Sequence, residues 1–595
     1  MPSNRNHVGF PRTPPAQRGE WAAVLLMMLM SAALSFRVFF PHLRDIVIFD
    51  EAYYIDKGQR LLHGELPVLA ENPLVAGFWA ILSLPFGRSP NWMMYAYGAG
   101  RFVVFAALWV GMYAAGRSLR GFVHPLVPLG FLLVSPGLLG LLDNSTDGVF
   151  AALSAFALAR FLVFLREGRL SIGVQTSFLL GLAALARNDG LFLLCVAELL
   201  TLFLLRGRLG GGGRQAGAIF LPAFCLVGAY IAIQALTSCS VNLGIARRSY
   251  DAFEQGEGVV RVASYHGRNP YVEGYDAARR LYGTPEENGY SIARAVFRNP
   301  AAFGRRLMTG MGQVPAQAMA AYGRGLRGVG AMLCFLALRG LVALWGRRAT
   351  AVLLVLVFWC SHLLLYGLTF YREGYLLLAY APVFWLAALG ASTLFDQRAR
   401  RAAFCATGVL GLLIFYGISK NNDLLWWPGV TFLVGMVVLW NLLNRHDPVL
   451  SRDTRAVLGA CGMLLLFSLQ THFSLPARLA LPRFPRIGTR ADEMAARFLA
   501  QTQREGTPVA SYTMAPVTLA RMYYVAPHID GRWIASAADF MEWVTRRNVH
   551  VFYVDKNLRD CEPKLWEIMQ GLIGTHLRVG FHSEDDYESV DVLFH

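Results

Sequence analysis

The chain has 595 residues, of which 55% are hydrophobic and only 16% are charged, and its mean hydropathy is +0.40. A soluble domain carries roughly 25% charged residues, so this composition argues against an ordinary soluble protein and indicates a membrane protein. The net charge of +16 does not indicate a nucleic-acid partner, because the arginines lie in short clusters between long apolar runs and form no single patch.

Long apolar runs recur along the chain, and most are about 20 residues long, the length that crosses a bilayer as a helix. They predict a mainly α-helical, polytopic membrane protein with about thirteen transmembrane helices. The first run, from Trp21 to Phe40, has no clear small-residue cleavage site, so we interpret it as an anchor and first span. Later spans are expected near residues 95–115, 123–142, 148–165, 172–186, 190–205, 216–237, 326–344, 351–369, 375–395, 402–418, 424–443 and 455–473.

Arginines follow every even-numbered span, whereas most loops on the other side lack such clusters. Because basic loops stay in the cytoplasm, this alternation predicts a cytoplasmic N-terminus and an extracytoplasmic C-terminus. The expected location is the plasma (inner) membrane. The apolar stretch from Leu74 to Phe86 would invert the pattern if it crossed the bilayer. It is short and bracketed by Pro73 and Pro85, so we expect it to lie along the outer membrane surface.

Three segments are expected to fold outside the membrane. They are a first outer loop at about 41–94, a large outer loop at about 238–325, and the tail at 476–595. The large loop mixes charge signs and predicts helices near 274–282 and 290–308.

The tail has the composition of a small globular domain. It predicts strands at 509–512, 550–554 and 590–594 and amphipathic helices at 536–547 and 562–572. Alternating strands and helices predict an α/β fold, so the chain should divide into a membrane domain (1–475) and an extracytoplasmic domain (476–595).

The clearest chemical signal is the run Phe49-Asp50-Glu51-Ala52-Tyr53-Tyr54, just after the first span. A carboxylate at the membrane interface has a low dielectric on one side, which can raise its pKa and suit it to accept a hydroxyl proton. A structural alternative is that Asp50 caps a surface helix at 51–63 and Glu51 favours the helix dipole.

Further polar clusters lie at the predicted outer ends of the spans. They are Glu71-Asn72-Pro73-Leu74, Arg101, the run from Asp143 to Asp147, Arg187-Asn188-Asp189, and the run from Tyr371 to Tyr375 that contains Arg372. If they converge on one outward cavity, acids and cations together suit a reaction with a phosphate leaving group. Arg101, near the start of the second span, would help to hold that phosphate.

Taken in order, these residues resemble the GT-C glycosyltransferases, in particular the branch of the bacterial aminoarabinose transferases of lipid A and the protein O-mannosyltransferases. That branch has an Asp-Glu pair in its first outer loop, like Asp50-Glu51, and a Glu-Lys-Pro-Pro-like stretch later in that loop, like the one that begins at Glu71. Its Thr-Asp at the fourth span is similar to Thr146-Asp147, and its Arg-x-x-Tyr-Leu-Leu run is similar to the one from Arg372.

The resemblance implies a GT-C membrane catalytic domain and a sugar donor carried on polyprenyl phosphate in the bilayer. The acceptor would be an extracytoplasmic glycan, lipid or protein. Asp50 would deprotonate the acceptor hydroxyl and Asp147 would orient the reactants, with Glu51 as the third catalytic residue. The anomeric centre would invert, and Arg372 and Arg187 would stabilise the leaving phosphate. Glu71, Asn72, Asp143, Arg101 and Tyr375 complete the expected substrate site.

Some positions depart from the branch. The lysine expected after Glu71 is Asn72, and Arg187-Asn188-Asp189 stands where the aminoarabinose transferases tend to have Lys-Gly-Pro. These differences argue against aminoarabinose as the donor sugar. The sequence assigns no definite cofactor, and a divalent metal held by Glu71 and His63 is compatible with it.

Two alternatives remain open from the sequence. A transporter or flippase of a lipid-linked sugar would show repeated halves and charges at mid-membrane depth, whereas the charged clusters here lie at the outer ends. A non-catalytic subunit of polysaccharide assembly would tolerate the loss of Asp50.

Overall fold

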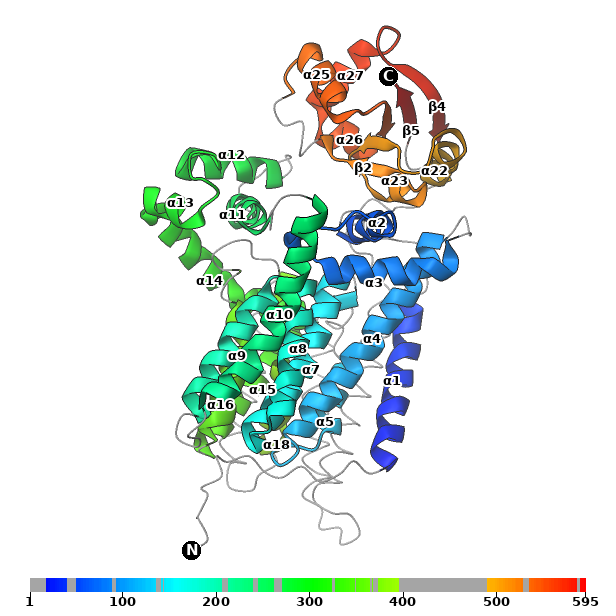
Figure 1. Ribbon diagram of the computed structural model, residues 1–595. Coiled ribbons are helices and arrows are strands. Elements are labelled where there is room, and N and C mark those ends of the chain that lie inside the picture. The colour runs from blue at the N-terminus through cyan, green and yellow to red at the C-terminus, as the bar shows by residue number, and fades with distance from the viewer. Residues whose placement is uncertain are drawn as a thin grey trace, which may run out of the picture. The chain divides into compact units, whose positions relative to one another are not determined.

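The computed structural model describes most of the chain (Figure 1). The described residues form two compact units. Unit 1 holds those within 1–37, 103–265 and 270–479, and unit 2 holds those within 38–102 and 480–595. The described residues are 18–39, 50–87, 92–134, 141–142, 144–205, 212–238, 244–261, 270–323, 327–347, 349–363, 366, 373–394, 490–527, 534–585 and 589–595.

Apolar helices long enough to cross a membrane dominate unit 1. In the described part of the chain, four helices meet the length and composition of a span: Tyr95–Ser118, Ser145–Glu167, Gln215–Thr237 and Tyr375–Thr393. Large side chains of α10 (Gly212–Ser238), such as Leu221, Phe224 and Leu236, are exposed, as expected of a surface that lipid covers. The chain is therefore a multi-pass membrane protein.

Helices of the bundle lie at the first ten predicted spans, and four of these helices have the length and composition of a span. Their bounds are α1 (Arg18–Phe39), α4 (Trp92–Ser118), α5 (Leu126–Val134), α7 (Ser145–Glu167), α8 (Leu170–Ala186), α9 (Asp189–Leu205), α10, α15 (Arg327–Gly346), α16 (Thr350–Trp359), η5 (Cys360–Leu363), η6 (Glu373–Ala379) and α18 (Tyr380–Leu394). The predicted spans at 402–418, 424–443 and 455–473 lie outside the described residues. The total of about thirteen therefore stays a prediction.

The ends of α7 show why this helix has its length. Asn144 caps the first turn, because its side-chain oxygen accepts from the backbone N–H groups of Thr146 and Asp147 at 3.0 and 3.4 Å. Gly168 ends the helix in the left-handed conformation, with φ 68°. The cap places Asp147 in the first turn of a span, at the end of the helix rather than at its middle.

The large outer loop is helical over more of its length than expected. Its helices are α11 (Ile245–Arg261), α12 (Pro270–Tyr282), α13 (Ile292–Arg298) and α14 (Pro300–Gly323). The single helix predicted at 290–308 is broken before Pro300, because a proline suits the first turn of a new helix. The amphipathic α11 was not predicted.

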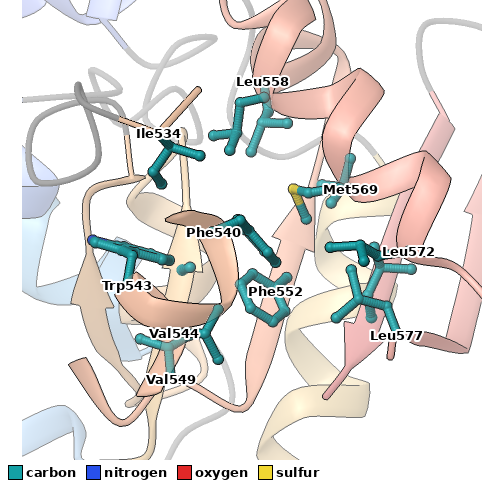
Figure 2. Close-up of a cluster of buried hydrophobic side chains, with 14 of the residues drawn as sticks. Ile534, Phe540, Trp543, Val544, Val549, Phe552, Leu558, Met569, Leu572 and Leu577 are labelled. Atoms are coloured by element: carbon teal, nitrogen blue, oxygen red, sulfur yellow. The ribbon is translucent and has the colours of Figure 1, made fainter. Parts of the chain in front are cut away.

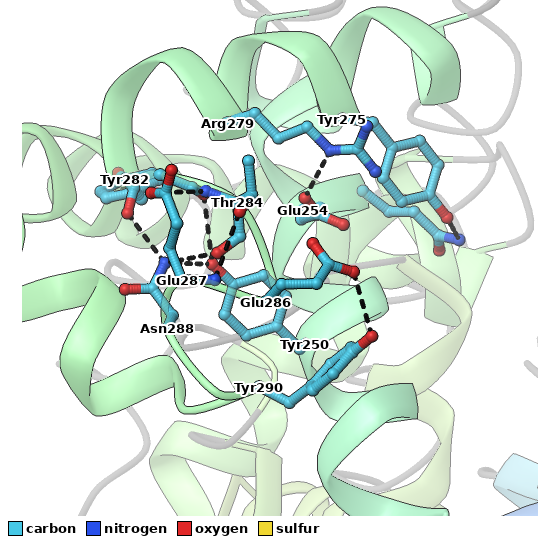
Figure 3. Close-up of polar contacts among 12 residues, drawn as sticks. Tyr250, Glu254, Tyr275, Arg279, Tyr282, Thr284, Glu286, Glu287, Asn288 and Tyr290 are labelled. Carbon is cyan, nitrogen blue, oxygen red and sulfur yellow. Dashed lines mark hydrogen bonds and ion pairs between the residues drawn. The ribbon is translucent and has the colours of Figure 1, made fainter. Parts of the chain in front are cut away.

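Polar contacts hold α11, α12 and the following turn together (Figure 3). The side-chain amide of Asn288 is buried and donates to the Tyr250 hydroxyl at 2.8 Å and to the backbone oxygen of Tyr282 at 2.9 Å. Arg279 on α12 pairs with the buried Glu254 on α11, with Nε and Oε1 3.2 Å apart. This part of the loop thus has its own polar core.

The first outer loop in unit 2 is a pair of crossing helices, α2 (Asp50–Leu62) and α3 (Pro73–Ser83). The short turns η2 (Leu69–Glu71) and η3 (Leu84–Phe86) precede and follow α3. The two helices approach closely at Gly58, where an added Cβ would lie 2.8 Å from the backbone nitrogen of Ala80. A larger residue at this position would push α2 away from α3.

The tail contains a five-stranded sheet with the order β2-β1-β3-β5-β4. β1 (Pro508–Ser511) is parallel to β2 (Tyr523–Val525) and to β3 (Val551–Val554), whereas β5 (Ser589–Phe594) is antiparallel to β3 and to β4 (Arg578–Glu584). The three strands expected from the sequence are β1, β3 and β5. β2 and β4 were not predicted, because β2 is short and the outward face of β4 is largely exposed.

Helices cover this sheet and enclose its core (Figure 2). They are α22 (Arg490–Thr502), α23 (Ala515–Leu519), α25 (Ala537–Arg547), α26 (Lys556–Cys561) and α27 (Pro563–Leu572). Phe540 and Trp543 of α25 pack with Phe552 of β3, and Met569 and Leu572 of α27 close the same cluster. The two predicted helices, at 536–547 and 562–572, are α25 and α27.

Candidate active site

The acidic pair Asp50-Glu51 forms the beginning of α2, so the helix starts at Asp50 itself. Acids in the first turn are favoured by the helix dipole. Glu51 is buried, with 1% of its surface exposed. Positions 50, 53, 54 and 57 follow the spacing of one helix face, so Tyr53, Tyr54 and Lys57 share a face of α2 with the position of Asp50.

Glu71 closes a polar cluster on this face. Its Oε1 accepts from the Tyr53 hydroxyl at 2.8 Å and lies 2.7 Å from Nζ of Lys57. Its Oε2 accepts from the backbone N–H of Val68 at 3.1 Å. A residue predicted for the site thus lies beside the helix that the acidic pair begins.

The backbone explains why the next residue is an asparagine. Asn72 has φ 57°, a left-handed conformation that asparagine tolerates better than lysine does. Its side-chain amide is buried and donates to the Tyr54 hydroxyl at 2.8 Å. Asn72 therefore fixes the turn between η2 and α3, and Lys57 of α2 provides the cation beside Glu71.

Electrostatics keep Glu71 ionised. Burial would raise the pKa of its carboxyl, but Lys57, Tyr53 and the Val68 N–H outweigh burial and lower that pKa. A carboxyl group with a lowered pKa in the folded state stabilises the fold above its unfolded pKa, and this stabilisation is lost as the pH falls through the folded value.

We expect Glu71→Gln to lower the free energy of unfolding at pH 7 by about 1–3 kcal/mol, because bonds to a charged acceptor are replaced by weaker ones. Thermal unfolding of the full chain in nanodiscs measures this difference. The difference in free energy of unfolding between the variant and the wild type should have its full size above pH 4.5, the ordinary pKa of glutamate. It should shrink as the pH falls below that value. If this difference instead grows at acidic pH, ionised Glu71 does not stabilise the fold.

A divalent metal bound by Glu71 and His63 is compatible with the sequence, but the described part of the chain does not contain a suitable set of ligands. No group of three or more His, Cys, Asp or Glu residues there is arranged to hold a metal. Glu71 pairs with Lys57, and the His63 ring lies 2.9 Å from the backbone oxygen of Gln59. We therefore derive no step through a metal.

Arg101 lies on α4, where its guanidinium stacks over the ring of Tyr97, 4.2 Å from the ring centre. Tyr97 is fully buried and stacks with Trp79 of α3. These contacts attach Arg101 to the aromatic packing between α3 and α4. Its predicted contact with a phosphate stays a prediction.

A second cluster, in unit 1, surrounds Arg187 at the turn between α8 and α9. Arg187 forms ion pairs with Asp147 of α7 and with Asp189, the first residue of α9. The Tyr366 hydroxyl also donates to Asp189, and the guanidinium lies over the ring of Tyr375 in η6, 4.6 Å from its centre. Three predicted site residues, Asp147, Arg187 and Tyr375, therefore lie together.

This cluster defines the role of the arginine. Its side chain is 14% exposed and lies between two carboxylates that are 8% and 13% exposed. Because both carboxylates share its charge, Arg187 is suited to fix Asp147 in place rather than to act as a free anion site. The predicted site residues Asp143 and Arg372 lie outside the described residues.

Lys57, Asp189 and Tyr366 are among the residues of these clusters that were not predicted as site residues. A signal for the first is present in the sequence, since the chain has 4 lysines among its 55 basic residues. The ammonium of lysine is a compact cation, unlike the planar guanidinium of arginine. Asp189 lies two residues after Arg187, but Tyr366 joins the cluster only through the tertiary fold.

Comparisons with known proteins address the fold. The sequence matches no protein-family profile and no curated protein. The structure is similar to ArnT from Cupriavidus metallidurans bound to undecaprenyl phosphate, with a TM-score of 0.51 and 13% identity over 97% of this chain and 98% of that one. It is likewise similar to apo ArnT from the same organism, with a TM-score of 0.50 and 14% identity over 96% and 98% of the two chains.

The chain has the GT-C fold. The resemblance predicted from four short motifs is thus confirmed at the level of the fold, over nearly the whole chain. A likeness to the archaeal oligosaccharyltransferase AglB from Archaeoglobus fulgidus has a TM-score of 0.47, at 13% identity over 91% of this chain and 70% of that one. Within the GT-C fold, Asp50-Glu51 begins α2 in the first outer loop and Asp147 lies in the first turn of α7.

Proposed function

We propose that this chain is a membrane glycosyltransferase that moves a sugar from polyprenyl phosphate to an acceptor outside the cytoplasm. The observation that carries the proposal is the GT-C fold, shared with an ArnT structure bound to undecaprenyl phosphate, together with an acidic pair at the start of α2. Such a donor is held by the bilayer and requires no nucleotide site.

In the proposed reaction Asp50 accepts the proton of an acceptor hydroxyl, and the hydroxyl oxygen attacks the anomeric carbon. A new glycosidic bond forms, the bond from the anomeric carbon to the phosphate oxygen breaks, and polyprenyl phosphate leaves. Attack from the face opposite the phosphate inverts the anomeric centre. The leaving oxygen gains negative charge, so a preorganised cation beside it lowers the barrier.

We assign this cation to Lys57 together with Arg372. Lys57 shares a helix face with position 50, and its ammonium is half-buried beside Glu71. The branch that this chain resembles has a lysine at the position of Asn72, and Lys57 supplies a charge to the same turn from the neighbouring helix. Asp147, fixed by Arg187, orients the reactants.

The end position of Asp147 supports an enzyme over a transporter of lipid-linked sugars. A transporter would place its charges near the middle of the spans. Asp147 is instead the third residue of the 23-residue helix α7, and Arg187 and Asp189 belong to the turn between two helices. We place this end of α7, the large loop and the 476–595 domain on the extracytoplasmic side of the inner membrane.

The test is mass spectrometry of lipids and glycans from a deletion strain that carries either the wild-type gene or Asp50→Asn. We expect one sugar mass to disappear from a glycan, lipid or protein in the deletion and to return only with the wild-type gene. A matched control is Arg497→Ala, on the exposed surface of α22. Full restoration by Asp50→Asn would reject the proposal in favour of a non-catalytic subunit.

A further inference from the structure

The sheet of the tail ends in an edge strand, and side chains of α2 bond to backbone groups on the outer side of that strand. β2 is the outer strand of the sheet and pairs with β1 on one side. An edge strand presents unpaired N–H and C=O groups on its other side. There, Nη2 of Arg60 donates to the Tyr524 oxygen at 3.2 Å, and the Tyr524 N–H bonds to the Asp56 carboxylate.

Asp56 and Arg60 act together in this contact. They are one helical turn apart on α2, and Nε of Arg60 donates to Oδ2 of Asp56 at 2.8 Å. The guanidinium also stacks over the ring of Tyr523, 4.5 Å from its centre. The planar guanidinium of Arg60 thus contacts a carboxylate, a backbone oxygen and an aromatic ring at once. A lysine side chain cannot make this combination of contacts.

A second contact joins the tail to the start of α4. The indole nitrogen of Trp92 donates to the backbone oxygen of Leu519 at 3.3 Å, and Arg521 stacks over the indole ring. Trp92 is 2% exposed. The tail is therefore attached both at α2 and at Trp92, and both contacts lie within unit 2.

The contact costs electrostatic energy. Asp56 is 4% exposed, and burial raises the pKa of its carboxyl despite the opposing effects of Arg60, Lys57 and the Tyr524 amide. A buried ion pair of this kind adds little net stability but defines a geometry. That geometry is useful here, because a helix of 13 residues has little stability of its own.

The angular arrangement on α2 shows what the contact can control. At about 100° per residue, Asp56 and Arg60 lie about 90° to one side of the face that contains positions 50, 53, 54 and 57. Gly58, which contacts α3, lies about 90° to the other side. The helix is thus held from both sides, with the proposed catalytic face between them.

We propose that Asp56 and Arg60 are positioning residues through which the C-terminal domain fixes the rotation of α2, and with it the acidic pair at the start of that helix. The inference rests on the proposed function only in taking Asp50 as the base. It assigns to the domain a role in catalysis without contact with substrate. A 1 Å displacement of a catalytic group can cost about 100-fold in rate, so a loosened α2 should transfer sugar slowly.

The experiment is hydrogen–deuterium exchange of the full chain in nanodiscs, combined with steady-state sugar transfer from a polyprenyl-phosphate donor. In Arg60→Ala and Asp56→Asn we expect amide exchange in α2 to rise about tenfold while exchange in α7 is unchanged. Turnover should fall about tenfold with the donor KM within about twofold of the wild type. Arg497→Ala, which removes an exposed arginine of the same domain, should change none of these values.

Unchanged exchange of α2 in Arg60→Ala and Asp56→Asn would overturn the inference. If Arg60→Ala does not accumulate, Arg60→Lys replaces it, because the ammonium keeps the charge but cannot span Asp56 and Tyr524, and the same criterion applies. Asp50→Asn, measured alongside, should lose transfer with normal exchange. Transfer retained by Asp50→Asn would reject the proposed function alone, since exchange of α2 still decides the positioning role.

Discussion

Replacing Arg187 by methionine should lower the free energy of unfolding by about 3–5 kcal/mol, the expected cost of removing one partner from a buried ion pair. Asp147 and Asp189 would then lie close together, mostly buried, without the cation that both of them contact. Thermal and denaturant unfolding of the full chain in nanodiscs measures the loss. The matched control is Arg160→Met on the exposed surface of α7, for which we expect a change of at most about 0.5 kcal/mol.

A combined variant separates charge from packing. Arg187→Met together with Asp147→Asn and Asp189→Asn removes all three charges, so most of the lost stability should return. Sugar transfer should not return, because the carboxylate of Asp147 is absent. If Arg187→Met is no less stable than Arg160→Met, then the ion-pair cluster does not hold the ends of α7 and α9 as described.

Replacing Lys57 by glutamine should reduce turnover by about 100-fold, the scale seen when one group that stabilises a developing negative charge is removed. The expected cause is the loss of the ammonium beside the leaving phosphate. Steady-state transfer from a synthetic polyprenyl-phosphate sugar measures the effect. Lys564→Gln on the exposed surface of α27 makes the same chemical change outside the site and should leave turnover unchanged.

Glu71→Gln distinguishes the charge of Lys57 from its contact with Glu71. That variant keeps the ammonium and removes its carboxylate partner. We expect a smaller loss of turnover than in Lys57→Gln, because the cation remains available to the phosphate. Lys57→Gln with turnover within about twofold of the wild type would remove Lys57 from the site and leave the phosphate to Arg372.

The membrane helices were predictable because their signal is local. A run of about 20 apolar residues must span or be buried wherever the rest of the chain lies. Described helices lie at ten of the predicted spans, and four of them have the length and composition of a span. Breaks inside helical regions were less predictable. Pro300 starts a new helix where a continuous one was expected, and the amphipathic α11, which is polar on average, was not predicted.

The site was predictable in its residue types and only partly in its contacts. The sequence by itself determined that Asp50-Glu51, Glu71 and Asp147 lie at the ends of helices, since each follows or precedes an apolar run. Tertiary structure alone decided that Lys57 pairs with Glu71, that Arg187 is shared by two carboxylates, and that Arg60 binds the edge of a sheet more than 400 residues away. The reason is physical: helix ends depend on neighbouring residues, whereas the partner of a charge depends on which elements pack against it.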